Sequence, residues 1–354
     1  MIAPTDDRAA AFTAEPAPTT DRTRPAQDQT AEKKKRRVSV PREKLAEIHS
    51  VSDAPVTKQI ADFVLFFAAA GVAVWSWYAG LWPVTVVAWL VGGFFGLTKP
   101  LTFHDFAHKT MFKENWKNEV GGTATGTLIM VPLTAYRVAH RRHHAHLATE
   151  KDPELWPFTS PKYSRTFRLF SAFAETVFGM VYTPLLFLRD VLTADSISAD
   201  EYRKIGREYV LIVLFWGGLL GGVHLLGAWE LFLVGYIAPV AIAGAFQTLN
   251  KYVEHLGLHG HDTLANTRNV VHPDPLGTFC SWWMQNIDHH GSHHIYAKVP
   301  YDKLPETSDL IYTQEVAADA PNYVSYWSAA WEMVKSLPNP HAGPAWTDYY
   351  RGRA

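Results

Sequence analysis

Eight of the seventeen histidines in this chain fall into three tight clusters. The clusters are His104 with His108, then His140, His143 and His144, and finally His290, His293 and His294. On a helix, residues three or four positions apart lie on the same face, so each cluster can direct its imidazoles at a common point. Imidazole is a ligand of zinc, copper, iron and nickel. The spacing therefore predicts a metal site.

The number of imidazoles predicts two metal ions rather than one. His255 closely follows a long apolar segment and is a ninth candidate ligand. Four ligands saturate a structural zinc ion, and a catalytic zinc ion needs only three from the protein. The lone Cys280 excludes an intrachain disulfide and a Cys-x-x-Cys pair, so nitrogen and oxygen must supply the ligands. His224, alone in an apolar segment, is expected to contact a neighbouring helix. Five histidines that flank the clusters are expected to have roles other than direct ligation: His146, His259, His261, His272 and His289.

Polar residues beside the clusters are candidates for orienting the imidazoles. A metal-bound histidine usually donates its second ring N–H to a carboxylate or a carbonyl oxygen. The candidates for this role are Asp105, Asp152, Glu254, Asn286 and Asp288. A solvated carboxylate or a helix cap is the alternative interpretation of each acidic residue. No nucleophile or base motif for acyl transfer is evident, so we expect no catalytic residue beyond the metal ligands.

Two long apolar segments must position these clusters. Residues 63–98 contain no charged residue and are interrupted only at Gly80-Leu-Trp-Pro83. Residues 209–249 contain Glu230 as their only Asp, Glu, Lys or Arg, with a turn expected at residues 227–229. A membrane-spanning helix needs about 20 apolar residues, so each segment predicts a helical hairpin. The expected spans are residues 62–80, 83–101, 209–226 and 229–249, and a soluble protein with two buried hairpins is the alternative.

Basic residues predict the orientation in the membrane. Neither hairpin turn carries Lys or Arg, whereas the segment between the hairpins is rich in both. Both termini and every histidine cluster are therefore expected in the cytoplasm. Residues 169–188 are also long enough to cross, but a crossing there would put the second and third clusters on opposite sides. This segment is expected to lie in the membrane interface, as is the weakly apolar segment 120–133.

Three regions are expected along the chain. Residues 1–45 show no apolar periodicity and predict a disordered tail. The basic run at residues 33–37 is interpreted as a cytoplasmic flank of the membrane domain rather than as a nucleic-acid-binding site. The net charge of −1 for the chain likewise gives no indication of nucleic-acid binding. Residues 46–310 are expected to form the membrane domain, and residues 311–354 a C-terminal cytoplasmic tail.

The three clusters resemble the histidine boxes of the membrane fatty acid desaturase superfamily, which also includes alkane and sterol hydroxylases and carotenoid ketolases. The matching motifs are His104-Asp-Phe-Ala-His108, His140-Arg-Arg-His-His144 with Asp152-Pro153, and Asn286-Ile-Asp-His-His-Gly-Ser-His-His294. Glu254-His255-Leu-Gly257, followed by Asn266-Thr-Arg268, resembles the additional ligand segment of that superfamily. Phe106, Asn269 and Ala297 differ from the residues that are common at these positions in the superfamily. None of the three is a candidate ligand, so the differences affect the assignment to a subgroup and not the predicted metal ligands.

The resemblance implies an all-α integral membrane protein with four transmembrane helices in two hairpins, interfacial helices and a cytoplasmic helical cap. The cap would hold two non-haem iron ions on the eight box histidines and His255. The implied reaction introduces a double bond into a long acyl chain, carried by a lipid, by CoA or by a carrier protein. It consumes O2 and two electrons, and a separate ferredoxin or cytochrome b5 type donor is expected because no His-Pro-Gly-Gly haem motif is present.

Three other functions are compatible with parts of the pattern. A hydroxylase or ketolase of alkane, sterol or carotenoid would use the same ligands. A membrane zinc protease is suggested by His104-Asp-x-x-His108, but its motif requires glutamate where this chain has Asp105. A metal carrier would need ligands along a transmembrane path, whereas these clusters lie outside the expected spans.

Overall fold

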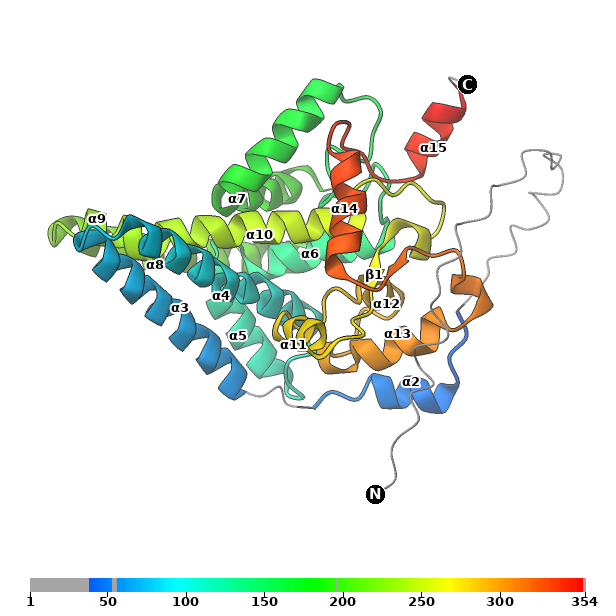
Figure 1. Cartoon of the computed structure of the whole chain (residues 1–354), viewed down its shortest axis with the longest axis horizontal. Coiled ribbons are helices and arrows are strands. Elements are labelled where there is room, and N and C mark those ends of the chain that lie inside the picture. Colours follow the sequence, from blue (N-terminus) through cyan, green and yellow to red (C-terminus); the bar gives the residue numbers. More distant parts are fainter. Residues whose placement is uncertain (1–37, 53–55, 195–196, 353–354) are drawn as a thin grey trace. The chain divides into compact units, whose positions relative to one another are not determined.

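A computed structural model describes residues 38–52, 56–194 and 197–352 of the chain (Figure 1). Its regular structure is helical apart from β1 (Asn269–Val270) and β2 (Asn322–Tyr323), two short strands that pair in parallel. The predicted all-α class is therefore confirmed. Residues 1–37 of the tail expected at residues 1–45, including its basic run, lie outside the described residues.

Five described helices are long and apolar enough to cross a membrane, judged by length and composition. They are α3 (Val56–Tyr78), α4 (Trp82–His108), α7 (Arg165–Thr193), α8 (Ala199–Leu225) and the continuous α9 (Trp229–Phe232), η2 (Leu233–Ile237) and α10 (Ala238–His255). Four of the five overlap the segments expected to span the membrane, although α3 and α8 end before residues 80 and 226. The fifth, α7, contains the segment that we expected in the interface.

Close packing between α4 and α10 brings the histidine-bearing ends of these two helices together. A Cβ atom added at Gly96 would lie 2.9 Å from the Ala243 side chain, and one at Gly93 would overlap Ile242. Small residues permit this close approach of two helices. Because α4 continues to His108, the first histidine cluster lies on its extension, as predicted.

Helix α7 packs along α10 and near each of its ends contacts a segment that lies outside the candidate spans. It bends at Phe178, where the backbone leaves helical geometry. Near its beginning, Arg168 Nε donates to the Pro340 carbonyl oxygen at 2.8 Å. Near its end, Asp190 forms an ion pair with Arg142, which lies within the second histidine cluster.

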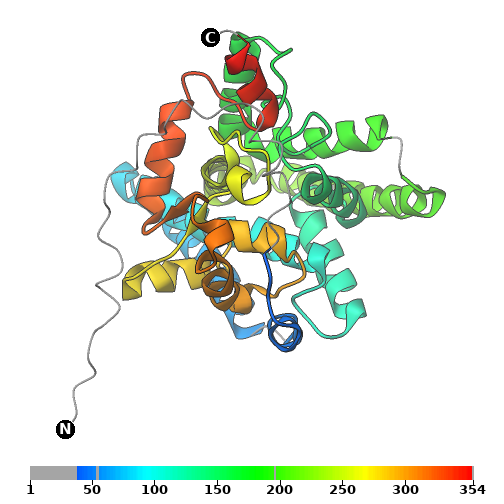
Figure 2. The same ribbon diagram turned by 90° about the vertical axis from the view of Figure 1, so that its right-hand side faces the viewer.

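Shorter helices complete the part of the fold that surrounds the histidines (Figure 2). They are α2 (Arg42–Ile48), α5 (Asn115–Leu128), α6 (Leu133–Ala145), α11 (Pro275–Trp283), α12 (His290–Ile295), α13 (Leu304–Tyr312), α14 (Tyr326–Ser336) and α15 (Pro344–Arg351). Short 3-10 turns lie at Leu264–Asn266, Tyr301–Lys303 and Glu315–Ala317. The segment 120–133, expected as one interfacial helix, is divided between α5, a turn and the start of α6.

Helices lie within both regions that were expected to be tails. Helix α2 begins at Arg42, and Ile48 is fully buried in a cluster with Met111. At the other end, α14 packs Met333 into the largest hydrophobic cluster. The Trp346 side chain of α15 donates from Nε1 to the Phe158 carbonyl oxygen at 2.8 Å. These segments lack a long apolar run, so their contribution to the core was not visible in the sequence.

Candidate metal centre

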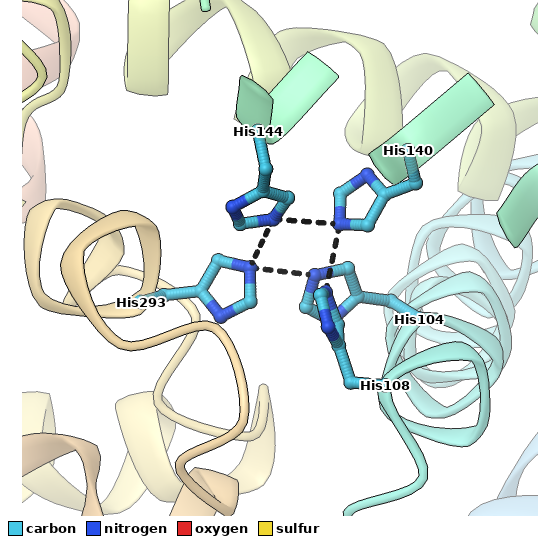
Figure 3. Close-up of side chains that lie close together, drawn as sticks. All are labelled: His104, His108, His140, His144 and His293. Atoms are coloured by element: carbon cyan, nitrogen blue, oxygen red, sulfur yellow. Dashed lines mark hydrogen bonds between the residues drawn. The ribbon is translucent and has the colours of Figure 1, made fainter. Parts of the chain in front are cut away.

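The structure brings the nine predicted histidines together in two groups. Within each group, one ring nitrogen of every member lies within 4.8 Å of those of the others. The first group, drawn in Figure 3, consists of His104, His108, His140, His144 and His293. The second group consists of His143, His255, His290 and His294. Neither group includes the six histidines that we expected to have other roles: His146, His224, His259, His261, His272 and His289.

Helix geometry divides each of the last two clusters between the groups. On α6, His140 and His144 are four residues apart and point to the first group, whereas His143 points to the second. On α12, His290 and His294 are four residues apart and belong to the second group, whereas His293 belongs to the first. One helix can thus supply ligands to two neighbouring sites.

The imidazoles approach one another through their Nε2 atoms. Neighbouring Nε2 atoms lie 2.9 to 3.1 Å apart in both groups. In four of the rings the other nitrogen, Nδ1, faces an oxygen atom. These rings and their partners are His104 with Asp105 (3.2 Å), His140 with Glu154 (2.8 Å), His143 with Asp152 (2.9 Å) and His255 with the Asn266 carbonyl oxygen (3.0 Å).

These contacts fit a bound cation. A carboxylate or carbonyl oxygen only accepts, so Nδ1 must be the donor and Nε2 must carry a lone pair in a neutral ring. Lone pairs that converge at about 3 Å repel one another unless a cation lies between them. The donor set, made entirely of imidazole nitrogen, suits a first-row transition metal. Both groups can therefore hold a metal ion.

Electrostatics keep most of the rings neutral. Burial, with a smaller contribution from neighbouring imidazoles, lowers the pKa well below its ordinary value in His140, His144, His290, His293 and His294. His143 is the exception. Burial lowers its pKa, but the carboxylates of Asp152 and Glu154 outweigh this and raise the pKa to about 9. The same carboxylates would stabilise a metal cation that replaces the proton.

The predicted orienting residues divide into two sets. Asp105 and Asp152 contact ring nitrogens of their neighbouring box histidines, and a Glu254 oxygen lies 3.5 Å from His290 Nδ1. Asn286 and Asp288 instead have other partners among the described residues. Asn286 donates to the Tyr301 carbonyl oxygen at 2.9 Å, and Asp288 forms an ion pair with His272.

Sequence reasoning missed Glu154 and the carbonyl group of Asn266. Glu154 is two residues beyond Asp152, and it receives the hydrogen bond from His140 Nδ1 because both acidic residues lie on the turn after α6. The Asp-Pro-Glu sequence after the second cluster was an available signal for Glu154. No local signal identifies a backbone carbonyl as the partner of His255.

A cavity reaches both groups from between α4, α6, α7 and α10. His104, His140, His143, His255 and His290 form part of its wall. Much of the remaining wall is apolar and includes Leu101, Ile129, Val131, Leu186, Phe187 and Ile287. The Glu175–Lys251 ion pair also borders it. Such walls suit an extended apolar chain that passes the histidines.

Comparison with known proteins agrees with this geometry. A model described as fatty acid desaturase matches residues 80–328. An sn-1 acyl-lipid omega-3 desaturase (ferredoxin) of Nostoc sp. (strain 36) is 22% identical over 66% of this chain and 69% of its own. A fatty acid desaturase of Bacillus subtilis (strain 168) is 24% identical over 58% of this chain and 61% of its own. Alkane 1-monooxygenase 1 of Pseudomonas aeruginosa is 26% identical over 68% of this chain and 60% of its own.

Proposed function

The chain belongs to the fatty acid desaturase family and is an oxidoreductase, and from this premise we propose that it introduces a double bond into a long acyl chain. The observation that supports this most strongly is the largely apolar cavity whose wall includes histidines of both groups. In the proposed reaction, two neighbouring methylenes lose one hydrogen each. O2, two electrons and two protons are consumed, and two water molecules are released.

We propose that each histidine group holds one iron ion. The first would be bound by His104, His108, His140, His144 and His293, and the second by His143, His255, His290 and His294. When bound, iron supplies the redox chemistry with O2 that an unactivated methylene requires. Asp105, Asp152 and Glu154 would hold the Nδ1–H groups, fix the ring orientations and leave the Nε2 lone pairs free for the metal.

The cavity would position the substrate. Leu101, Val131 and Phe187 line an apolar path that excludes water from the reacting carbons. A chain held there presents the same methylenes to the histidine groups in each turnover, so the double bond is expected at a fixed position. The name of the Nostoc relative supports an acyl-lipid substrate and a ferredoxin donor. Acyl-CoA or acyl-carrier substrates and a cytochrome b5 type donor are the other candidates.

We propose that α3, α4, α8 and the continuous α9–α10 cross the membrane, with the cap and both termini in the cytoplasm. His144 and His294 lie in adjoining groups, so the chain between them must cross the membrane an even number of times. Three candidate helices lie in that segment. Both ends of α7 contact segments of the proposed cap: Arg168 donates to the Pro340 carbonyl oxygen, and Asp190 forms an ion pair with Arg142. These contacts support α7 as the helix that does not cross.

This topology predicts which residues face the outside. In a Cys280→Ser background, Leu81→Cys and Leu226→Cys should react in intact cells with a membrane-impermeant maleimide, because both lie at hairpin turns. The exposed Lys162→Cys is the control and should react only after the cells are permeabilised. Labelling of Lys162→Cys in intact cells would contradict the proposed orientation.

Hydroxylation is the second candidate function, because one relative is named an alkane monooxygenase. The same histidines would serve both reactions. After the first hydrogen is removed, a desaturase removes a second one, whereas a hydroxylase transfers oxygen to the same carbon. A zinc protease is not supported, because His104 and His108 converge with three further histidines rather than forming a three-ligand site with a free glutamate base.

The product profile tests the proposal. A host that expresses the chain should accumulate new unsaturated acyl chains with the double bond at one position, as measured by gas chromatography with mass detection. A host expressing His143→Ala provides the matched control. Unchanged unsaturation, with new hydroxy or keto products from supplied alkanes or carotenoids, would instead identify a hydroxylase or ketolase.

A further inference from the structure

Two short helices beside the metal centre expose rows of large apolar side chains. On α14, Trp327, Trp331 and Val334 are 81%, 62% and 41% exposed. On α11, Leu276 and Phe279 are 71% and 52% exposed. The spacing of three or four residues places each row on one helix face, so these are continuous strips rather than scattered residues. We call these five residues the aromatic rim.

The five residues of the aromatic rim lie outside the hydrophobic clusters of the described residues, although Phe279 contacts Trp282 and Trp283 on its own helix. Helix α14 buries a different face, through Ala329 and Met333, in the largest hydrophobic cluster. On a third side of α14, Glu332 and Lys335 form an exposed ion pair at 2.6 Å. The helix is therefore held firmly, and among the described residues the ring contact of its exposed tryptophans is that of Trp327 with the adjacent Tyr326, at 6.2 Å between ring centroids.

Both helices are attached where the candidate span helices enter the cap. Tyr326 at the start of α14 donates from its hydroxyl to Asn250 Oδ1 of α10 at 3.1 Å. On α11, the Trp283 ring lies 5.7 Å from the ring of Phe95 on α4. Helix α14 runs crosswise to α10 in Figure 1, and α11, seen nearly end-on there, is seen lengthwise in Figure 2. Helices that cross a span at its end run roughly parallel to the membrane plane.

We propose that the aromatic rim lies in the lipid headgroup region, on the side of the membrane that carries the histidine groups. Tryptophan favours this region, and amphipathic helices bind there through an apolar face. The apolar surface continues onto α10, where Leu249 is 37% exposed beside Asn250. The basic Arg165 contacts the segment after α14, donating to the Pro338 carbonyl oxygen at 2.6 Å, which suits anionic lipid. Most of α14 lies beyond the residues that match the family model.

The proposal can be tested on the whole protein in nanodiscs of phosphatidylcholine and phosphatidylglycerol. In a Cys280→Ser background, an NBD fluorophore is attached to Trp331→Cys or to the matched control Glu332→Cys on the next residue of the same helix. The probe at residue 331 should show a blue-shifted emission and several-fold stronger quenching by doxyl-labelled lipid. The probe at residue 332 should instead be quenched by iodide in the buffer.

Two outcomes would overturn the proposal. Equal iodide quenching at both positions would place the aromatic rim in water. Protection of residue 331 that appears only when a reduced ferredoxin is added would identify a protein as its occupant. An unchanged metal content in both labelled variants checks that the fold is retained. Because the readout is probe environment, the result does not depend on which reaction the enzyme catalyses.

Discussion

Replacing His143 with alanine is expected to abolish product formation. The ring of His143 belongs to the second histidine group, and its Nδ1 atom contacts both oxygens of Asp152 at 2.9 Å. The substitution removes a proposed iron ligand and leaves a buried carboxylate without its partner. Loss of an outer partner of a metal ligand alone costs about 10- to 100-fold in affinity or activity, so loss of the ligand should cost more. Product is measured as new unsaturated acyl chains in the expressing host.

Matched substitutions separate this effect from general damage. His146→Ala lies three residues further along, is exposed and belongs to neither group, so it should retain activity. His341→Ala, also outside both groups, should do the same. His294→Ala and His255→Ala should each abolish product. Normal activity of His143→Ala would contradict the proposed centre, whereas normal activity of His255→Ala would remove only the ninth ligand.

Protein purified aerobically after iron-replete expression is expected to contain about two iron ions per chain, because nine convergent imidazoles exceed what one ion can use. His293→Ala in the first group and His290→Ala in the second should each lower the iron content, measured by inductively coupled plasma mass spectrometry. His146→Ala should leave it unchanged. A single tightly held zinc ion and no iron in the wild-type protein would contradict a di-iron centre.

The sequence alone predicted which histidines cluster and where the apolar hairpins lie, because both depend on local spacing. His140 and His144 share a helix face whatever surrounds them, since that follows from 3.6 residues per turn. The uncharged run at residues 63–98 likewise predicts a hairpin from its length. Helix α4 continues to His108 even though Pro100, a residue type that usually interrupts a helix interior, lies between the apolar run and the first cluster.

The distribution of the histidines between two groups required the tertiary structure. His143 and His144 are adjacent in the chain but belong to different groups, and the choice depends on how α6 faces α4, α10 and α12. Asn286 and Asp288 adjoin the third cluster, yet the backbone there turns through a positive φ of 49° at Asn286 and directs them elsewhere.

The contribution of the chain's C-terminal part also depends on long-range packing. Met333 and Trp346 bury their side chains against residues far earlier in the chain, such as Phe158. No apolar run in the C-terminal sequence indicates this packing. Spacing along the chain determines which side chains share a face of one helix. Only the packing of helices that are distant in the sequence decides which faces meet, and therefore which histidines come together in one group.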